Sequence, residues 1–216
     1  MCVQLCMNTT INNTQFTAIK LNSTTVQRRV VGNKFKDVNV NYVRILPEDK
    51  PAITRFSQEC NTHQLTKNIL EDIDDRFSEI FALTSQHKNL KKLNPKKILG
   101  LVETIDVIDT KNLTYLVSGR CDAYTKNKYA GIGKAIVKNV VQDAKNKDMI
   151  EVETYSLRDA KPFYEKMLFK SGKKQNYFKL GREDFDKMLK NGECIEKIKE
   201  YTELTEEEIK NIDVLK

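Results

Sequence analysis

The sequence predicts an α+β fold, and three observations carry this prediction. Alternating apolar residues recur in several short segments, as they do in strands with one buried face. Residues 132–146 instead form one apolar stripe at helical spacing, made of Ile132, Ile136, Val137, Val140, Val141 and Ala144. Strand-like and helix-like segments also alternate from residue 113 to residue 168. At 216 residues, the chain is within the size range of one domain with one core.

The N-terminal half begins with a segment of low apolar content. Residues 1–37 are rich in Asn and Thr, and we expect a mobile extension with a short hairpin around Gly32. Alternating apolar residues from position 38 predict a strand that ends at Pro47. Residues 51–78 then show helical spacing. Three further strands are expected at 79–86, 97–108 and 113–124.

The C-terminal half continues the alternation of helix and strand. A loop at 125–131 leads into the helix at 132–146, and a strand follows at 149–156. A second helix is expected at 159–168 and a last strand at 176–180. The longest helix of this half is therefore preceded directly by a loop that contains glycine.

We predict three parts along the chain: an N-terminal extension at 1–37, a central domain at 38–182 and a C-terminal helical extension at 183–216. The C-terminal part has too many apolar residues for a solvated tail, so its helices should pack on the domain or on a second subunit of a homodimer. These apolar positions are Phe185, Met188, Leu189, Ile195, Ile198, Ile209 and Ile212.

The loop before the long helix has the features of a phosphate-binding site. Gly131 and Gly133 lie one residue apart, so the backbone can adopt conformations that bring successive N–H groups toward one oxyanion. The helix that follows adds the positive end of its dipole and its unpaired N–H donors. The segment is therefore predicted to bind a phosphate group.

Two common phosphate-binding motifs fit this loop poorly. A P-loop needs glycine at position 128 and Ser or Thr at position 135, where the chain has Lys128 and Ala135. A dinucleotide-binding motif needs a small residue at the position of Ile136. The pattern that remains is Q/R-x-x-G-x-G/A, with Lys128 at the basic position.

This pattern resembles the pyrophosphate loop of the GNAT superfamily of acyl-CoA N-acyltransferases. A second segment, residues 160–169 with the sequence AKPFYEKMLF, is similar to the GNAT signature A-x-x-F-Y-x-K-x-G-F. The two patterns occur in the family's order, with one helix and one strand between them. The resemblance extends over roughly residues 38 to 182 and identifies the chain as a GNAT-like protein.

The resemblance implies the fold, the donor and the reaction. The fold would be a mixed, mostly antiparallel sheet flanked by helices, and the activity would be direct, sequential transfer of an acetyl group from acetyl-CoA to a primary amine of a small molecule or protein. No metal is implied. The residues implied in binding acetyl-CoA are Cys121, Ala123, Lys128, Tyr129, Ala130, Gly131, Ile132, Gly133 and Lys134.

The reaction requires proton transfer at two positions. A protonated amine must lose a proton before it attacks the thioester, and the departing thiolate benefits from receiving one. Tyr164 matches the tyrosine of the family motif and is the candidate acid; the alternative is a tyrosine of the core. Glu103 and Asp122 are candidate bases, with solvated strand residues as the alternative.

Three positions depart from the family pattern. Tyr129 stands at the first glycine of the loop, Leu157 at a frequent asparagine, and Leu168 at the glycine near the end of the motif helix. These departures leave open a noncatalytic protein that binds acyl-CoA and acts as a regulatory module.

The composition gives weaker indications of partners and location. The net charge of +7 permits an RNA-associated protein, but the basic runs are short and lack interleaved aromatics, so we expect a solvated basic surface. Five scattered cysteines without a C-x-x-C pair predict free thiols. The chain has no long apolar run and no signal-like N-terminus, which predicts a cytoplasmic protein without a membrane span.

Overall fold

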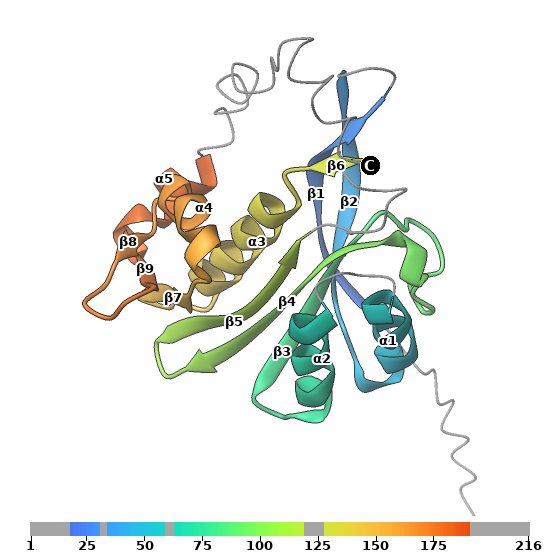
Figure 1. Cartoon of the computed structure of the whole chain (residues 1–216), viewed down its shortest axis with the longest axis horizontal. Helices are drawn as coiled ribbons and strands as arrows, with labels where there is room; N and C mark the ends of the chain where they lie inside the picture. Colours follow the sequence, from blue (N-terminus) through green and yellow to red (C-terminus); the bar gives the residue numbers. More distant parts are fainter. Residues whose placement is uncertain (1–17, 31–33, 59–62, 119–127, 191–216) are drawn as a thin grey trace, which may run out of the picture. The chain divides into compact units, whose positions relative to one another are not determined.

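The computed structural model describes residues 18–30, 34–58, 63–118 and 128–190 (Figure 1). It divides into two compact units. The first unit comprises Met1–Leu101 and Val117–Ile132, and the second comprises Val102–Leu116 and Gly133–Lys216. Two strands, β4 (Ile98–Val107) and β5 (Thr110–Ser118), contribute residues to both units.

The first unit is built on a long antiparallel hairpin. Its elements in chain order are β1 (Ile19–Arg29), β2 (Phe35–Arg44), η1 (Pro47–Asp49), α1 (Lys50–Gln58), α2 (His63–Glu71), η2 (Asp72–Asp74), β3 (Ser78–Thr84), η3 (Pro95–Lys97) and β6 (Tyr129–Ala130). Val40 and Val43 on β2 are completely buried, as are Ile53 and Phe56 on α1. The predicted helical region at 51–78 is thus two α-helices followed by a 3₁₀ turn.

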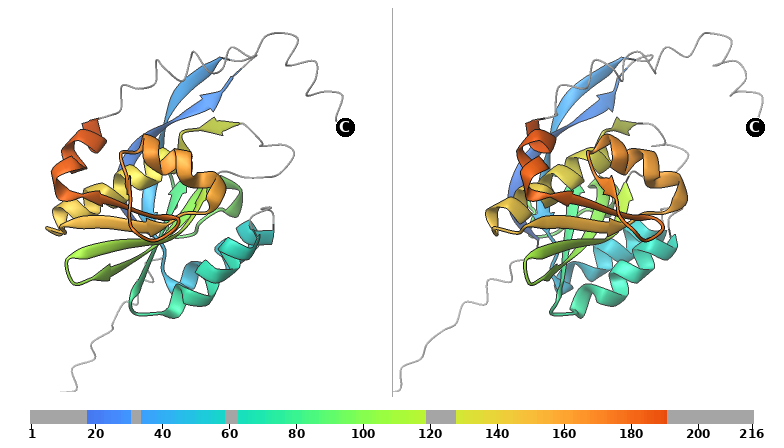
Figure 2. Two further views of the ribbon diagram at one scale, coloured as in Figure 1. Left: turned by 60° about the vertical axis from the view of Figure 1, so that its left-hand side comes forward. Right: turned by 90° about the vertical axis from the view of Figure 1, so that its left-hand side faces the viewer.

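The hairpin is longer than the sequence predicted. β1 begins at Ile19, inside the segment that was assigned to a mobile N-terminal extension, and residues 1–17 lie outside the described residues. β2 pairs with β3 only from Asn41 to Arg44, so the rest of the hairpin extends past β3. Both views of Figure 2 show β1 and β2, in blue, as a twisted two-stranded ribbon.

The second unit contains all of α3 (Ile132–Asn146) except Ile132. The elements that follow α3 are β7 (Glu151–Tyr155), η4 (Arg158–Ala160), α4 (Lys161–Lys166), β8 (Lys170–Ser171), β9 (Tyr177–Gly181) and α5 (Arg182–Lys190). The whole apolar stripe of α3 is buried, from Ile132 to Ala144. This confirms the helix predicted at 132–146. The short strands β6 and β8 were not predicted, because two residues carry too little periodicity to be recognised.

The strands form one mixed sheet in the order β6-β1-β2-β3-β4-β5-β7-β9-β8. The pairs β1–β2, β1–β6, β2–β3, β7–β9 and β8–β9 are antiparallel, whereas β5 and β7 run parallel. This agrees with the predicted mixed, mostly antiparallel sheet flanked by helices. Within the described residues, no helix is both long and apolar enough to cross a membrane.

α5 packs against α3 in the second unit. Phe185 and Met188 of α5 are both 1% exposed. The Nζ atom of Lys145 donates to Asp186 at 2.5 Å, and that of Lys138 donates to the carbonyl oxygen of Leu189 at 2.9 Å. The first helix of the C-terminal extension is therefore packed on the fold, and residues 191–216 lie outside the described residues.

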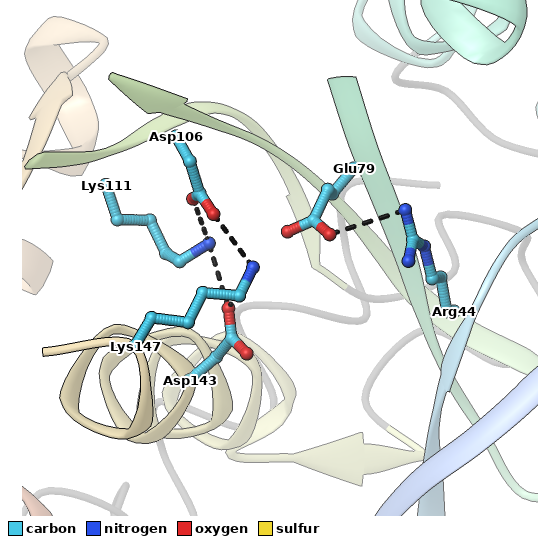
Figure 3. A network of polar contacts seen from close by, with 6 residues as sticks. All are labelled: Arg44, Glu79, Asp106, Lys111, Asp143 and Lys147. Carbon is cyan, nitrogen blue, oxygen red and sulfur yellow. Dashed lines mark hydrogen bonds and ion pairs between the residues drawn. The ribbon is translucent and has the colours of Figure 1, made fainter. Parts of the chain in front are cut away.

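A charge network also holds α3 against the hairpin of β4 and β5 (Figure 3). Lys111 on β5 is completely buried and pairs with Asp106 on β4 and with Asp143 on α3, the latter at 2.9 Å. Lys147 contacts the same two carboxylates at 2.8 and 3.2 Å. Because a buried ammonium group needs acidic partners, this network fixes the position of α3 on β4 and β5.

Candidate active site

The loop at residues 128–133 has the unusual backbone that was predicted for its glycines at Gly131 only, because Gly133 lies in the first turn of α3. Gly131 adopts a φ of +78°, in the left-handed region that side chains bearing a Cβ rarely occupy. A Cβ placed on Gly131 would meet no heavy atom within 4 Å. Conformation, and not lack of space, is therefore what requires glycine at this position.

α3 starts directly after Gly131, so its first unpaired N–H groups lie at the end of the loop. The first turn carries no acidic residue, and Lys134 and Lys138 are on the first two turns. Burial and then the charge of Lys134 lower the pKa of Lys138. Lys138 donates to the carbonyl oxygen of Leu189, so the helix terminus, its dipole and Lys134 are what favour an anion.

The pairing of β5 with β7 is short. It runs from Thr110↔Glu151 to Leu113↔Thr154, although β5 continues to Ser118. Past Leu113, the edge of β5 next to β7 has backbone groups that β7 does not use in this register. The Oγ1 atom of Thr114 is buried and has no hydrogen-bond partner in the part of the chain that the structure describes. Such orphaned polar atoms are rare and indicate a place for a ligand group.

Tyr164 lies at the end of this pairing. Its side chain is 5% exposed and lies close to Thr154, the last residue of β7 that pairs with β5. The hydroxyl of Thr154 itself donates to the carbonyl oxygen of Leu113 at 2.8 Å. Burial raises the pKa of Tyr164, and the nearby hydroxyl of Thr154 offsets part of that rise. A raised pKa keeps the hydroxyl protonated at neutral pH, as a proton donor requires.

The ring of Tyr164 is fixed by aromatic neighbours. Its centroid lies 5.1 Å from that of Phe163, 5.5 Å from that of Phe169 and 6.0 Å from that of Phe178. Tyr164 is thus a core residue as well as a candidate acid, and the two interpretations of the sequence are compatible. Packing of this kind limits the positions available to its hydroxyl group.

The end of α4 explains one departure from the family pattern. The N–H of Phe169 donates to the carbonyl oxygen of Tyr164, and that of Leu168 to Glu165, both at 3.0 Å. These bonds form a Schellman motif, in which the residue at the position of Leu168 takes a left-handed conformation. Leu168 has a φ of +68°, so it keeps the backbone of the glycine it replaces.

Glu103 is 1% exposed on β4, so the interpretation of this carboxylate as a solvated strand residue is wrong. β5 lies between β4 and β7 in the sheet, which separates the axes of β4 and β7 by about 10 Å. A proton transfer between Glu103 and the Tyr164 region would therefore need a substrate or a water molecule between them.

The remaining predicted residues divide into two groups. Lys128, Tyr129 and Ala130 are half-buried just before Gly131, and Lys134 is half-buried on α3, while Ile132 and Gly133 are buried. Cys121, Ala123 and the alternative base Asp122 lie outside the described residues. The role of each of these residues stays a prediction.

A pocket of about 700 Å³ lies elsewhere on the second unit, and none of the predicted site residues lines it. Its lining includes Glu153, Tyr155, Lys173 and Tyr177. The hydroxyl of Tyr177 donates to Glu153 at 2.5 Å, and this bond raises the pKa of Tyr177 well above its usual range. These two polar groups are therefore engaged with each other.

Sequence reasoning missed the residues that the hairpin brings to the loop. β6 pairs with β1, which places Arg28 opposite Tyr129, and the N–H of Arg29 donates to the carbonyl oxygen of Lys128 at 2.8 Å. The alternation from residue 26 indicated a hairpin, but nothing in the sequence linked it to a loop about 100 residues later.

No protein-family model matches the sequence, and no curated protein matches it. Solved structures do match in fold. A KacT variant with one tyrosine changed to phenylalanine is 14% identical, with a TM-score of 0.54 over 69% of this chain and 98% of that chain. AtaTR bound with AcCoA is 13% identical, with a TM-score of 0.53 over 69% and 97%. An acetyltransferase of the GNAT family from Staphylococcus aureus Mu50 is 14% identical, with a TM-score of 0.47 over 66% and 98%.

The similarities to the KacT variant and to AtaTR establish the fold. The chain has the fold of the GNAT superfamily of acyl-CoA N-acyltransferases, as the two sequence motifs predicted.

Proposed function

We propose that this chain is an N-acetyltransferase that transfers the acetyl group of acetyl-CoA directly to a primary amine. One observation carries the proposal: the buried Tyr164 lies close to Thr154, at the point where β5 and β7 stop pairing. A candidate proton donor therefore lies beside a strand edge that β7 leaves unpaired past Leu113.

The described residues fit the chemical groups of the donor. The pantetheine arm contains two amides, which can hydrogen bond to the backbone of β5 past Leu113. Thr114 has a buried hydroxyl oxygen with no hydrogen-bond partner among the described residues, and a ligand amide would satisfy it. The diphosphate group suits the loop at Gly131 and the N-terminus of α3. Cys121 and Ala123, which lie outside the described residues, stay proposed as further residues that bind acetyl-CoA.

Acetyl-CoA supplies an acetyl group activated as a thioester, and the residues of the chain control the protons. An acceptor amine has an ordinary pKa of about 10.4, so it must be deprotonated before it attacks. Glu103 is the proposed base and would receive this proton, directly or through water. A C–N bond then forms as the C–S bond breaks, and Tyr164 gives its proton to the thiolate sulfur. The attacking nitrogen loses its second proton to solvent water, and Tyr164 regains a proton from solvent after the products leave.

Negative charge develops on the carbonyl oxygen during this transfer. Backbone N–H groups of β5 past Leu113 are the proposed donors to that oxygen, because they are fixed in a strand and need no reorganisation. The fold supports the proposal: the AtaTR structure, which shares it, is bound with AcCoA. The acceptor would be a small molecule or a protein.

The proposal is tested by incubating the protein with acetyl-CoA and pools of amines. We expect free thiol to appear together with one product that carries an added acetyl group, detected by mass spectrometry. Tyr164→Phe under the same conditions is the control for background acetylation. Binding of acetyl-CoA without thiol release from any pool would instead identify a noncatalytic, ligand-sensing protein.

A further inference from the structure

The tip of the β1–β2 hairpin and the phosphate loop form one piece of sheet in the first unit (Figure 1). β6 pairs antiparallel with β1, with Gln27 opposite Ala130 and Arg28 opposite Tyr129. Gly131 follows β6 immediately. The hairpin therefore fixes the residues that enter the loop.

The register of these three strands aligns three side chains on one face. Arg28 is the partner of Tyr129 on β6 and of Lys36 on β2, and directly opposed residues in a sheet project to the same side. Neighbouring strands are about 4.8 Å apart, so the row from Tyr129 to Lys36 spans about 10 Å. We call Tyr129, Arg28 and Lys36 the basic row.

The surroundings of the basic row favour an anion. Arg28 and Lys36 are exposed, and among the described residues no carboxylate forms an ion pair with either of them. Asp37 and Gln27 are partners of each other one position along the hairpin and project to the opposite face. Two cations and a half-buried aromatic ring thus lie side by side without an acidic neighbour in the row.

Two cations beside an aromatic ring match the nucleotide end of coenzyme A, which carries a purine base and phosphate groups. An aromatic or guanidinium plane stacks on a purine base, and Arg and Lys bind phosphate. Tyr129 is two residues from Gly131, so a nucleotide whose diphosphate occupies the loop would have its base and ribose next to the row. A single-stranded RNA would instead need a longer basic track than two side chains.

We propose that the basic row binds the adenosine 3′-phosphate end of the coenzyme, with Arg28 and Lys36 on the 3′-phosphate and Tyr129 stacked on the adenine. This inference rests on the proposed function, because it assumes that the loop holds the diphosphate. In this inference, residues of the N-terminal hairpin make the protein bind coenzyme A more tightly than donors that lack the 3′-phosphate.

The test measures dissociation constants of coenzyme A and 3′-dephospho-coenzyme A by calorimetry. Wild-type protein should bind the dephospho form about tenfold more weakly, since a charge-assisted hydrogen bond contributes roughly that factor. Arg28→Gln and Lys36→Gln should each weaken binding of coenzyme A but leave binding of the dephospho form unchanged within about twofold. Lys20→Gln, an equal charge change on the same strand, is the matched control.

A second pair of variants tests the stacking. Tyr129→Ala should weaken both ligands about tenfold, while Tyr129→Phe, which keeps the ring, should bind both as the wild type does. Acetyl-pantetheine, which has no nucleotide, should bind all variants equally. Equal wild-type affinity for the two coenzyme forms would overturn the inference. So would binding of a single-stranded RNA oligonucleotide that Arg28→Gln abolishes while the coenzyme affinities stay unchanged.

The inference and the proposed function fail in different ways. Loss of the 3′-phosphate preference with acetyl transfer intact would remove only the role of the basic row. A strong 3′-phosphate preference in a protein that acetylates no amine would remove only the catalytic proposal.

Discussion

The regions around Tyr164 and around Gly131 are built differently. Around Tyr164, in the second unit, the side chain is buried among aromatic rings and held by a closed helix end. Around Gly131, the polar groups are backbone N–H donors of a loop and a helix terminus, and Arg28 and Lys36 nearby are exposed. One part depends on packing, and the other depends on backbone conformation and charge.

The difference follows from the chemistry that each part would perform. Proton transfer requires donor and acceptor within hydrogen-bond distance, so a proton donor must be held rigidly. A diphosphate is large, charged and tolerant of small displacements, and N–H groups with exposed cations suffice to bind it. Substitutions should therefore separate the two parts: turnover and stability respond near Tyr164, and affinity responds near Gly131.

The largest effect is expected at Tyr164. Tyr164→Phe keeps the ring contacts with Phe169 and Phe178 but removes the proton donor, so turnover should fall about 10²- to 10⁴-fold. The affinity for acetyl-CoA should change less than about threefold. Steady-state kinetics and calorimetry measure the two quantities. Tyr155→Phe, at an exposed tyrosine on β7, is the control, and wild-type turnover by Tyr164→Phe would exclude Tyr164 as the acid.

The buried charge network gives the next largest effect, on stability. Lys111→Met leaves Asp106 and Asp143 facing one cation instead of two, and we expect the free energy of unfolding to fall by about 3 kcal/mol. Lys147→Met removes the more exposed lysine from the same carboxylates and should cost less than about 1 kcal/mol. Urea denaturation followed by circular dichroism gives both values. If both variants lost the same free energy of unfolding, the burial of Lys111 would not be the reason that it stabilises the fold more than Lys147 does.

The same network predicts a pH dependence. Burial alone would raise the pKa of Asp106, but hydrogen bonds and charges from Lys111 and Lys147 outweigh it and hold the pKa below its ordinary value of 3.8. A carboxyl group with a lowered folded-state pKa stabilises the fold above its unfolded pKa, and this contribution is lost as the pH falls. Denaturation at a series of pH values below about 5 should show a weaker decline in Lys111→Met than in the wild type.

A moderate effect is expected in the loop. Gly131→Val places a β-branched residue at a positive φ, which costs on the order of 1–3 kcal/mol and should weaken acetyl-CoA binding roughly 10- to 100-fold. Gly131→Asn is the control, because asparagine tolerates the left-handed region. Calorimetry is the measurement. Unchanged affinity in the valine variant would remove this loop from the binding site.

The smallest effect is expected at the end of α4. Leu168→Gly relieves a left-handed leucine and should raise the free energy of unfolding by about 1 kcal/mol. Leu157→Gly, at an exposed leucine with a φ of −63°, should instead lower it by about 0.5–1 kcal/mol through chain entropy. Thermal unfolding of both variants tests this pair, and a destabilised Leu168→Gly would mean that side-chain contacts outweigh the strain.

The sequence by itself determined the elements that depend on local periodicity and on glycine. The stripe from Ile132 to Ala144 predicted α3 with its observed bounds, and Gly131 was recognised as the residue that needs an unusual backbone. Two motifs in the order of the GNAT family, with one helix and one strand between them, also indicated the fold. These signals are local, because a helix period or a positive φ is set by a residue and its near neighbours in the chain.

The tertiary structure alone decided which distant residues share a site. It buried Glu103, ended the pairing of β5 with β7 at Leu113, and brought Arg28 and Lys36 beside Tyr129. It also joined Lys111 to a carboxylate on α3. Each of these depends on strand register and on long-range packing, and register is fixed by the burial of whole strand faces, which no short segment of sequence specifies.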